Sequence, residues 1–123
     1  MLFQESEYQR YIDNLEKMLY DRVDDYELTG VRKPSKEVFD NARKLVSALC
    51  FVDTNSVYSF CITPEGLFQV LMSIYTQNKG TITVDSKGFR CYNKITQTMK
   101  FISKDYTVEQ ISDQLKKYMK NYL

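Results

Sequence analysis

The 123-residue chain contains no histidine and no tryptophan, and it has only two prolines and four glycines. Without histidine it cannot build a Ser–His–Asp triad, a Cys–His pair or a zinc site that uses imidazole. The glycines stand singly, so the sequence lacks a glycine-rich phosphate loop, and each is explained better as a turn residue. We therefore expect a protein that is not an enzyme and that uses no cofactor and no metal.

The sequence also lacks a secretory signal and a long apolar run. Its first seven residues are acidic rather than basic, and the apolar stretch over residues 67–75 is interrupted by Gln69 and Ser73. We expect a cytoplasmic protein that does not associate with membranes. A chain of this length buries a substantial core without disulfides or metals, which predicts a single domain over residues 1–123.

Cysteine occurs three times, at Cys50, Cys61 and Cys91. The number is odd and the spacing is wide, so neither a disulfide framework nor a C-x-x-C metal site is indicated. All three have apolar neighbours in sequence, and we expect buried, reduced thiols that pack as small hydrophobic groups. A reactive thiolate needs a nearby cation, and the nearest one in sequence is Arg90, beside Cys91.

Two helices are predicted in the first half of the chain and one at its end. Apolar residues spaced i, i+3, i+4 over residues 8–19 indicate the first helix. The second begins after Ser35, a typical N-cap residue, and ends near Cys50. The third begins after Thr107, which is expected to form a capping box with Gln110.

Between these helices the apolar period changes to that of β-strands. Strands are expected at residues 57–62, 67–75, 81–85, 89–93 and 97–102, and turns at residues 63–66, 77–80 and 86–88. Segregated helices and strands predict an α+β two-layer fold. It would contain two N-terminal helices, an antiparallel meander of four to five strands and a C-terminal helix.

One cluster of carboxylates stands out, in the loop between the first two helices. The candidate partner-binding residues there are Asp21, Asp24, Asp25, Tyr26 and Glu27. The cluster lacks the alternating ligands and the fixed glycine of an EF-hand loop. Two interpretations stay open, a solvated charged loop and a surface that attracts a basic partner.

The formal net charge of +1 conceals an uneven distribution. Residues 1–40 carry ten acids and six bases, a net of −4, whereas residues 41–123 carry eleven bases and six acids, a net of +5. Bases and aromatics interleave over residues 79–104, as in sheets that bind single-stranded nucleic acid. The candidate nucleic-acid-binding residues are Lys87, Arg90, Tyr92, Lys94 and Lys100.

Two observations favour a different interpretation of this basic segment. No RNP-like run, helix-turn-helix signature or KH-type glycine loop accompanies it. Phe89 and Tyr92 are three residues apart, so on a regular strand they face opposite sides of the sheet. Lysines that discourage edge-to-edge pairing of sheets are the alternative explanation.

Several short motifs follow one another in the first three quarters of the chain. They are Asp24-Asp25-Tyr26, Pro34-Ser35-Lys36-Glu37, Asn41-Ala42, Ile62-Thr63-Pro64-Glu65-Gly66 and Thr81-Ile82-Thr83-Val84-Asp85. In this order, residues 20–93 resemble a loosely defined family of short bacterial proteins that are often found beside toxin–antitoxin or mobile-element genes. The two tryptophans of that family are missing, and Val23 and Met72 lie near their positions. The resemblance implies a small non-catalytic interaction protein and supplies no binding residues.

Three functions therefore stay open. The first is a protein-interaction module, antitoxin- or immunity-like, that binds a protein partner. The second is a nucleic-acid-binding protein that uses the sheet at residues 79–104. The third is a homo-oligomeric structural domain, such as a homodimer, whose interface is covered by Tyr11, Tyr118 and Tyr122 or by an exposed strand.

Overall fold

The computed structural model describes residues 5–21, 32–52, 57–74 and 77–118. Along these ranges the elements are α1 (Glu5–Asp21), α3 (Lys36–Leu49), β1 (Val57–Ile62), β2 (Phe68–Ile74), β3 (Gln77–Val84), β4 (Gly88–Asn93), β5 (Thr98–Ser103) and α4 (Val108–Tyr118). The strands pair antiparallel in the order β1-β2-β3-β4-β5. The predicted α+β fold is confirmed, and the described ranges contain two helices before a five-stranded meander and one helix after it.

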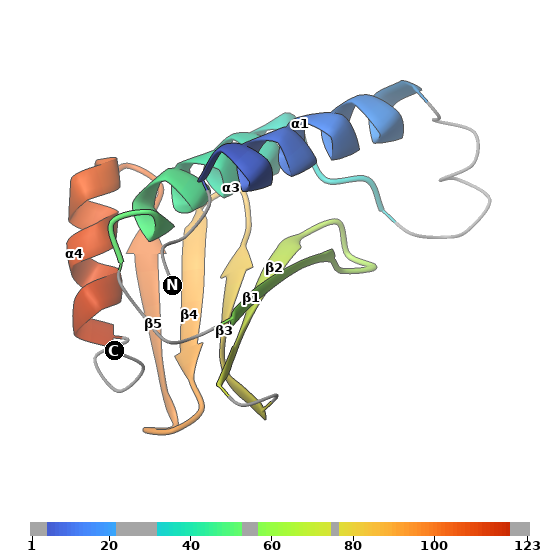
Figure 1. The fold of residues 1–123 in the computed structure, drawn as a ribbon. Helices are drawn as coiled ribbons and strands as arrows, with labels where there is room; N and C mark the ends of the chain where they lie inside the picture. The colour runs from blue at the N-terminus through green and yellow to red at the C-terminus, as the bar shows by residue number, and fades with distance from the viewer. Residues whose placement is uncertain (1–4, 22–31, 53–56, 75–76, 119–123) are drawn as a thin grey trace.

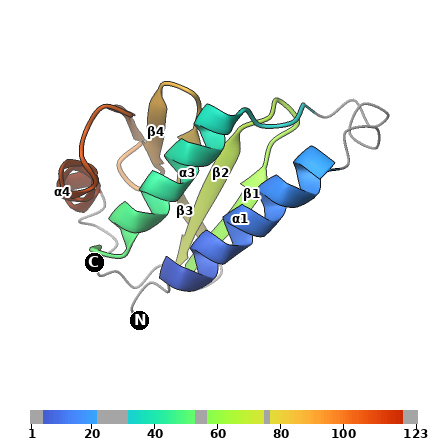
Figure 2. The ribbon, with the colours of Figure 1, turned by 90° about the horizontal axis from the view of Figure 1, so that it is seen from above.

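The helices form one layer and the sheet forms the other. Seen from above, α1 and α3 lie side by side across the sheet, and α4 lies at the end of the sheet near β5 (Figures 1 and 2). Side-chain contacts agree with this arrangement. Tyr8 of α1 packs on Phe60 of β1 with ring centroids 4.7 Å apart, and Lys100 of β5 bonds to Gln114 of α4.

Local capping signals position two of the helices. The Ser35 hydroxyl accepts a hydrogen bond from the backbone N–H of Val38 at 3.3 Å, so it caps α3 as predicted. At α4, the Gln110 N–H donates to the Thr107 hydroxyl at 3.1 Å, and the Thr107 N–H donates to the Gln110 side chain at 2.9 Å. This reciprocal pair is the predicted capping box.

The hairpin between β2 and β3 differs from the prediction. Residues 77–80 were expected to form a turn, but β3 already begins at Gln77, which pairs with Ile74. The register shifts between Met72 and Ser73, so Met72 pairs with Gly80 while Ser73 pairs with Asn78. This bulge accommodates one extra residue in β3. The polar residues 77–80 therefore remain in the strand, although their composition is typical of a turn.

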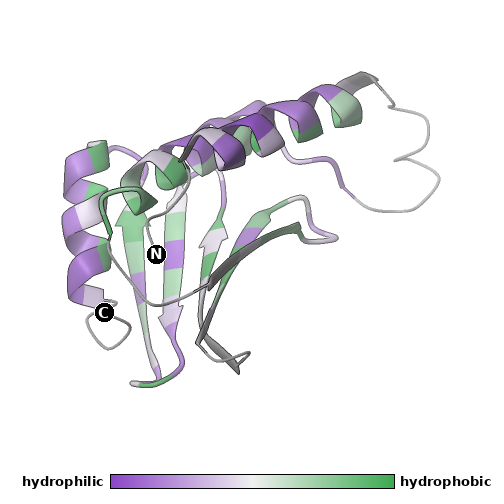
Figure 3. Ribbon diagram, in the orientation of Figure 1, coloured by the Kyte–Doolittle hydropathy of each residue, from purple (hydrophilic) through white to green (hydrophobic). Residues whose placement is uncertain are grey.

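The core lies between the helices and the facing side of the sheet. Figure 3 shows the helices as alternating hydrophilic and hydrophobic segments, as expected for elements with one buried face. On α1, Ile12 and Leu19 are buried, whereas Tyr11 and Met18 are about half exposed, so the buried stripe is narrower than the spacing suggests. Among the described residues, no helix has the length and apolar character needed to cross a bilayer.

Two buried asparagines tie the layers together. The Asn41 amide of α3 donates to the backbone carbonyl of Asp85 at 2.8 Å. The Asn93 amide of β4 donates to the carbonyl of Tyr118, the last residue of α4, also at 2.8 Å. Because buried amides must find partners, these bonds fix how α3 and α4 sit on the sheet.

Candidate functional site

The side of the sheet away from the helices, here called the open face, is defined by two rows of cross-strand partners. Pairing runs from Cys61 to Gln69, Thr83, Arg90 and Phe101 in one row, and from Ser59 to Leu71, Thr81, Tyr92 and Met99 in the other. None of these ten residues is buried. Their neighbours along the strands point the other way and include the buried Phe68, Val70, Ile82, Val84, Phe89, Cys91 and Ile102. Among the described residues, no helix covers the open face (Figures 1 and 2).

Large apolar side chains gather on the open face where β4 and β5 pair. Met99 is 64% exposed, Phe101 52% and Tyr92 37%. Tyr92 lies directly opposite Met99, and Phe101 is its diagonal neighbour across the pair, within reach of an aromatic ring. Single exposed apolar residues are ordinary, but adjacent ones on an uncovered face form an apolar patch of the kind found at interaction sites.

Arg90 is the one charged residue among the ten of the open face. It lies opposite Phe101, and its Nε is 3.5 Å from a carboxylate oxygen of Asp85. The other oxygen of Asp85 accepts hydrogen bonds from the backbone N–H groups of Lys87 and Gly88 at 2.8 and 2.9 Å. The turn before β4 therefore holds the carboxylate that orients Arg90. The patch thus combines one guanidinium with apolar groups.

The structure separates the basic residues that the sequence placed in one segment. Lys100 pairs with Cys91 and faces the helices, where it bonds to Gln114 and lies 5.9 Å from the ring of Tyr118. Lys87 and Lys94 are exposed at opposite ends of β4. At about 3.4 Å per residue, these two lysines are roughly 24 Å apart along the strand. Of the five candidate residues, the open face brings together only Arg90 and Tyr92.

The predicted separation of Phe89 and Tyr92 is confirmed, since Phe89 is buried and Tyr92 is exposed. Sequence reasoning left Met99 and Phe101 out of the candidate residues. The signal that identifies them is the alternation in β5, where Met99 and Phe101 lie on one side and the buried Ile102 on the other. The candidate acidic cluster, Asp21, Asp24, Asp25, Tyr26 and Glu27, lies outside the residues whose side chains the structure describes.

The three thiols differ in exposure: Cys50 is half-buried, Cys61 is exposed and Cys91 is buried. Cys91 is buried as predicted, and this burial raises the pKa of its thiol from 9.0 to about 12, despite a weak opposing effect of Lys100. Arg90 does not activate it, because adjacent residues of a strand face opposite sides. Cys61 is exposed on the open face, so the expectation that it is buried is wrong. Its alternation with Phe60 and Ile62 places it on the side that lacks helices.

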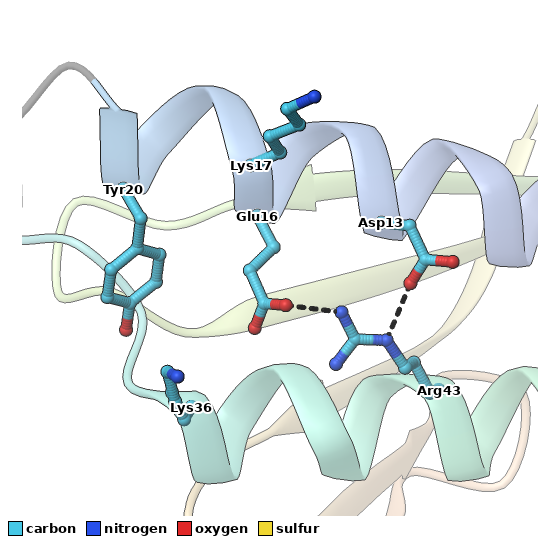
Figure 4. Close-up of a pocket in the computed structure, with 6 residues that line it drawn as sticks. All are labelled: Asp13, Glu16, Lys17, Tyr20, Lys36 and Arg43. Atoms are coloured by element: carbon cyan, nitrogen blue, oxygen red, sulfur yellow. Dashed lines mark hydrogen bonds and ion pairs between the residues drawn. The ribbon is translucent and has the colours of Figure 1, made fainter.

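A groove of about 340 Å³ between α1 and α3 is lined mainly by charged side chains (Figure 4). Arg43 of α3 reaches across it to Glu16 at 2.6 Å and to Asp13 at 2.8 Å, both on α1, and it also contacts Asp40 at 3.1 Å. Partial burial opposes the charge of Arg43, but hydrogen bonds with Glu16 and Asp13 outweigh it and raise the pKa of the guanidinium. Because Arg43 bridges α1 and α3 through these ion pairs, we interpret the groove as an ion-paired helix contact rather than a ligand site.

A second polar contact joins α1 to α3. The Gln9 side chain of α1 donates hydrogen bonds to the backbone carbonyl of Arg43 and to the hydroxyl of Ser47, at 2.9 and 3.1 Å. Within the described part of the chain, no three His, Cys, Asp or Glu residues come close enough to hold a metal ion.

Comparisons with protein-family models, curated proteins and solved structures find no significant match to this chain.

Proposed function

We propose that this protein is a non-catalytic protein-interaction module that binds its partner through the open face. The observation that carries the proposal is the contiguous uncovered patch of Tyr92, Met99 and Phe101 around a single cation, Arg90. Protein interfaces are enriched in aromatic residues, methionine and arginine, and their centres are depleted in other charges. The threonines and Gln69 of the adjacent strands supply the polar rim that such interfaces have.

The energy available from this patch suits specific recognition. Fully burying a large apolar side chain contributes about 1.5–3 kcal/mol. Since Tyr92, Met99 and Phe101 are each about half exposed, completing their burial contributes roughly 3 kcal/mol. That equals the energy of a typical interface hot spot. The resemblance of residues 20–93 adds a biological setting, in which the partner is a small toxin or effector encoded beside this protein.

Nucleic-acid binding is the alternative that the same face must be tested for. Tyr92 and Phe101 offer surfaces for stacking, but phosphate binding draws on several cations, and the open face has one. Fluorescence anisotropy with single-stranded and duplex oligonucleotides at low salt is expected to stay flat. Salt-sensitive binding that depends on Arg90 and Tyr92 would instead assign the face to nucleic acid.

The decisive experiment is coexpression with the products of the neighbouring genes, followed by purification of the complex. The variant Met99→Ser with Phe101→Ser should lose a stoichiometric partner that the unmodified protein retains. Tyr106→Ser is the matched control, because Tyr106 is 42% exposed in the turn after β5, outside the open face, and it should retain the partner.

Alkylation of Cys61 provides an independent measurement on the same face. A bound partner that covers the open face should protect this exposed thiol, because Cys61 and Phe101 belong to the same row of cross-strand partners. Equal retention of the partner by both variants, with Cys61 still reactive in the complex, would show that binding occurs elsewhere. Sedimentation of the isolated protein as a dimer that Phe101→Ser dissociates would assign the face to self-association.

A further inference from the structure

A second concave region lies at the other end of the sheet and on its helix side. It is a pocket of about 350 Å³ whose described lining residues are Glu7, Tyr8 and Tyr11 of α1 and Phe60 of β1. Three of the four residues are aromatic and the fourth is a carboxylate. The volume falls within the range of about 300–1,000 Å³ that is typical of small-molecule sites.

The rings are arranged by the helix and by the edge strand. Tyr8 and Tyr11 are three residues apart, so they share one face of α1. Tyr8 contacts Phe60 with ring centroids 4.7 Å apart and planes tilted by 41°. Tyr11 is 46% exposed, which leaves much of its ring open at the mouth of the pocket. The apolar wall is therefore continuous from β1 to the surface of α1.

Among the described lining residues of the pocket, the only charged side chain is the carboxylate of Glu7. Among the described residues, no lysine or arginine forms an ion pair with Glu7. The ion pairs described for α1 are those with Arg43, and they lie in the groove between α1 and α3. Burial, with a smaller contribution from Glu7, raises the pKa of Tyr8, so its ring stays un-ionised at neutral pH. Neutral π faces and a nearby carboxylate both attract positive charge, and neither attracts an anion.

We infer that this pocket binds an organic cation of the methylated-ammonium class, with Tyr8, Tyr11 and Phe60 contacting its methyl groups and Glu7 countering its charge. Such a cation loses little hydration when it meets aromatic faces, and aromatic rings attract it through their quadrupole. The inference is independent of the proposed function, because none of the four residues belongs to the open face. The cation can be free in solution, as in choline, or can be the side chain of a trimethylated lysine.

The test is an NMR titration of the ¹⁵N-labelled protein that separates charge from shape. Choline is compared with 3,3-dimethylbutan-1-ol, its neutral isostere, in which carbon replaces the quaternary nitrogen. Choline should shift the amide signals of Tyr8, Tyr11 and Phe60 and should bind at least about tenfold more tightly than the alcohol. A third arm uses the N-acetyl methylamide of trimethyllysine. If this derivative binds more tightly than choline, a partner's side chain is the source of the cation, and the reverse order indicates a free cation.

Two variants show whether the effect comes from the pocket. Glu7→Gln and Tyr11→Leu should each weaken choline binding at least about threefold, since one removes the charge and the other an exposed ring. Tyr8 is left unchanged because it packs against the core. Tyr106→Leu is the control and should bind as the unmodified protein does. Equal affinity for choline and the alcohol would overturn the inference, as would the absence of localised shifts at about 50 mM choline.

Discussion

Arg43 offers the most direct test of how α1 is attached to the rest of the fold. It makes ion pairs with three carboxylates, Glu16 and Asp13 on α1 and Asp40 on its own helix, at 2.6, 2.8 and 3.1 Å. Arg43→Met keeps most of the aliphatic packing and removes the charge. Because the loss leaves the two α1 carboxylates beside Asp40 without a cation, we expect the free energy of unfolding to fall.

The exposure of each carboxylate sets the size of its contribution. The side chain of Glu16 is 25% exposed, whereas those of Asp13 and Asp40 are 60% and 74% exposed. A charge-assisted bond in a partly buried setting contributes about 1–1.5 kcal/mol, and solvent screening reduces the exposed pairs to about 0.5 and 0.3 kcal/mol. Arg43→Met should therefore cost about 2 kcal/mol, a substantial part of the 5–15 kcal/mol typical of a domain.

Urea denaturation with double-mutant cycles measures these couplings. Arg43→Met is combined in turn with Glu16→Gln, Asp13→Asn and Asp40→Asn, and the coupling energies should decrease in that order. Lys17→Met is the control, since Lys17 is an exposed residue on the rim of the same groove, and it should change stability by less than about 0.5 kcal/mol. A coupling to Glu16 no larger than that to Asp40 would refute the argument from burial.

Other predictions concern stability and thiol chemistry. Gly88→Ala should destabilise the protein by about 3 kcal/mol in urea denaturation, because φ at Gly88 is +153° and an added Cβ would lie 2.2 Å from the carbonyl oxygen of Ile102. Ser112→Ala should raise the unfolding free energy by about 1 kcal/mol, since the buried Ser112 hydroxyl has no hydrogen-bond partner among the described residues; an unchanged or lower value would contradict this. In the native protein, a thiol reagent at pH 8 should modify Cys61 quickly and leave Cys91 unmodified, as mass spectrometry of peptides would show. Burial raises the pKa of Cys91 from 9.0 to about 12, so its contribution to stability is complete below pH 9.0 and is lost as the pH rises toward 12; Cys91→Val should lessen this alkaline loss.

The local features of the fold were predictable because they depend on neighbours in sequence. Ser35 and the Thr107–Gln110 pair cap their helices with atoms at most three residues away. The order of helices and strands follows from the period of apolar residues, which changes from helical to alternating and back. Residues 77–80 were wrongly expected to form a turn, since only pairing with β2 reveals the bulge that keeps them in a strand.

The candidate surfaces depended on information that alternation alone does not contain. A strand pattern shows that Arg90 and Cys91 face opposite ways, but it does not show which side the helices cover. Packing of α3 and α4 on the side of Cys91 turned Lys100 toward Gln114 and left Arg90 with Tyr92, Met99 and Phe101.

The α+β fold class, the capping of two helices and the alternation of each strand can be predicted from the amino-acid sequence, because bonds and side-chain periods over a few residues encode these features. Long-range packing, in contrast, selects which face of the sheet stays uncovered and which aromatic rings of α1 and β1 meet around a pocket. Both outcomes result from contacts between segments that are distant in sequence, such as Asn41 with Asp85 and Tyr8 with Phe60, and the packing of the whole core sets how these segments are placed.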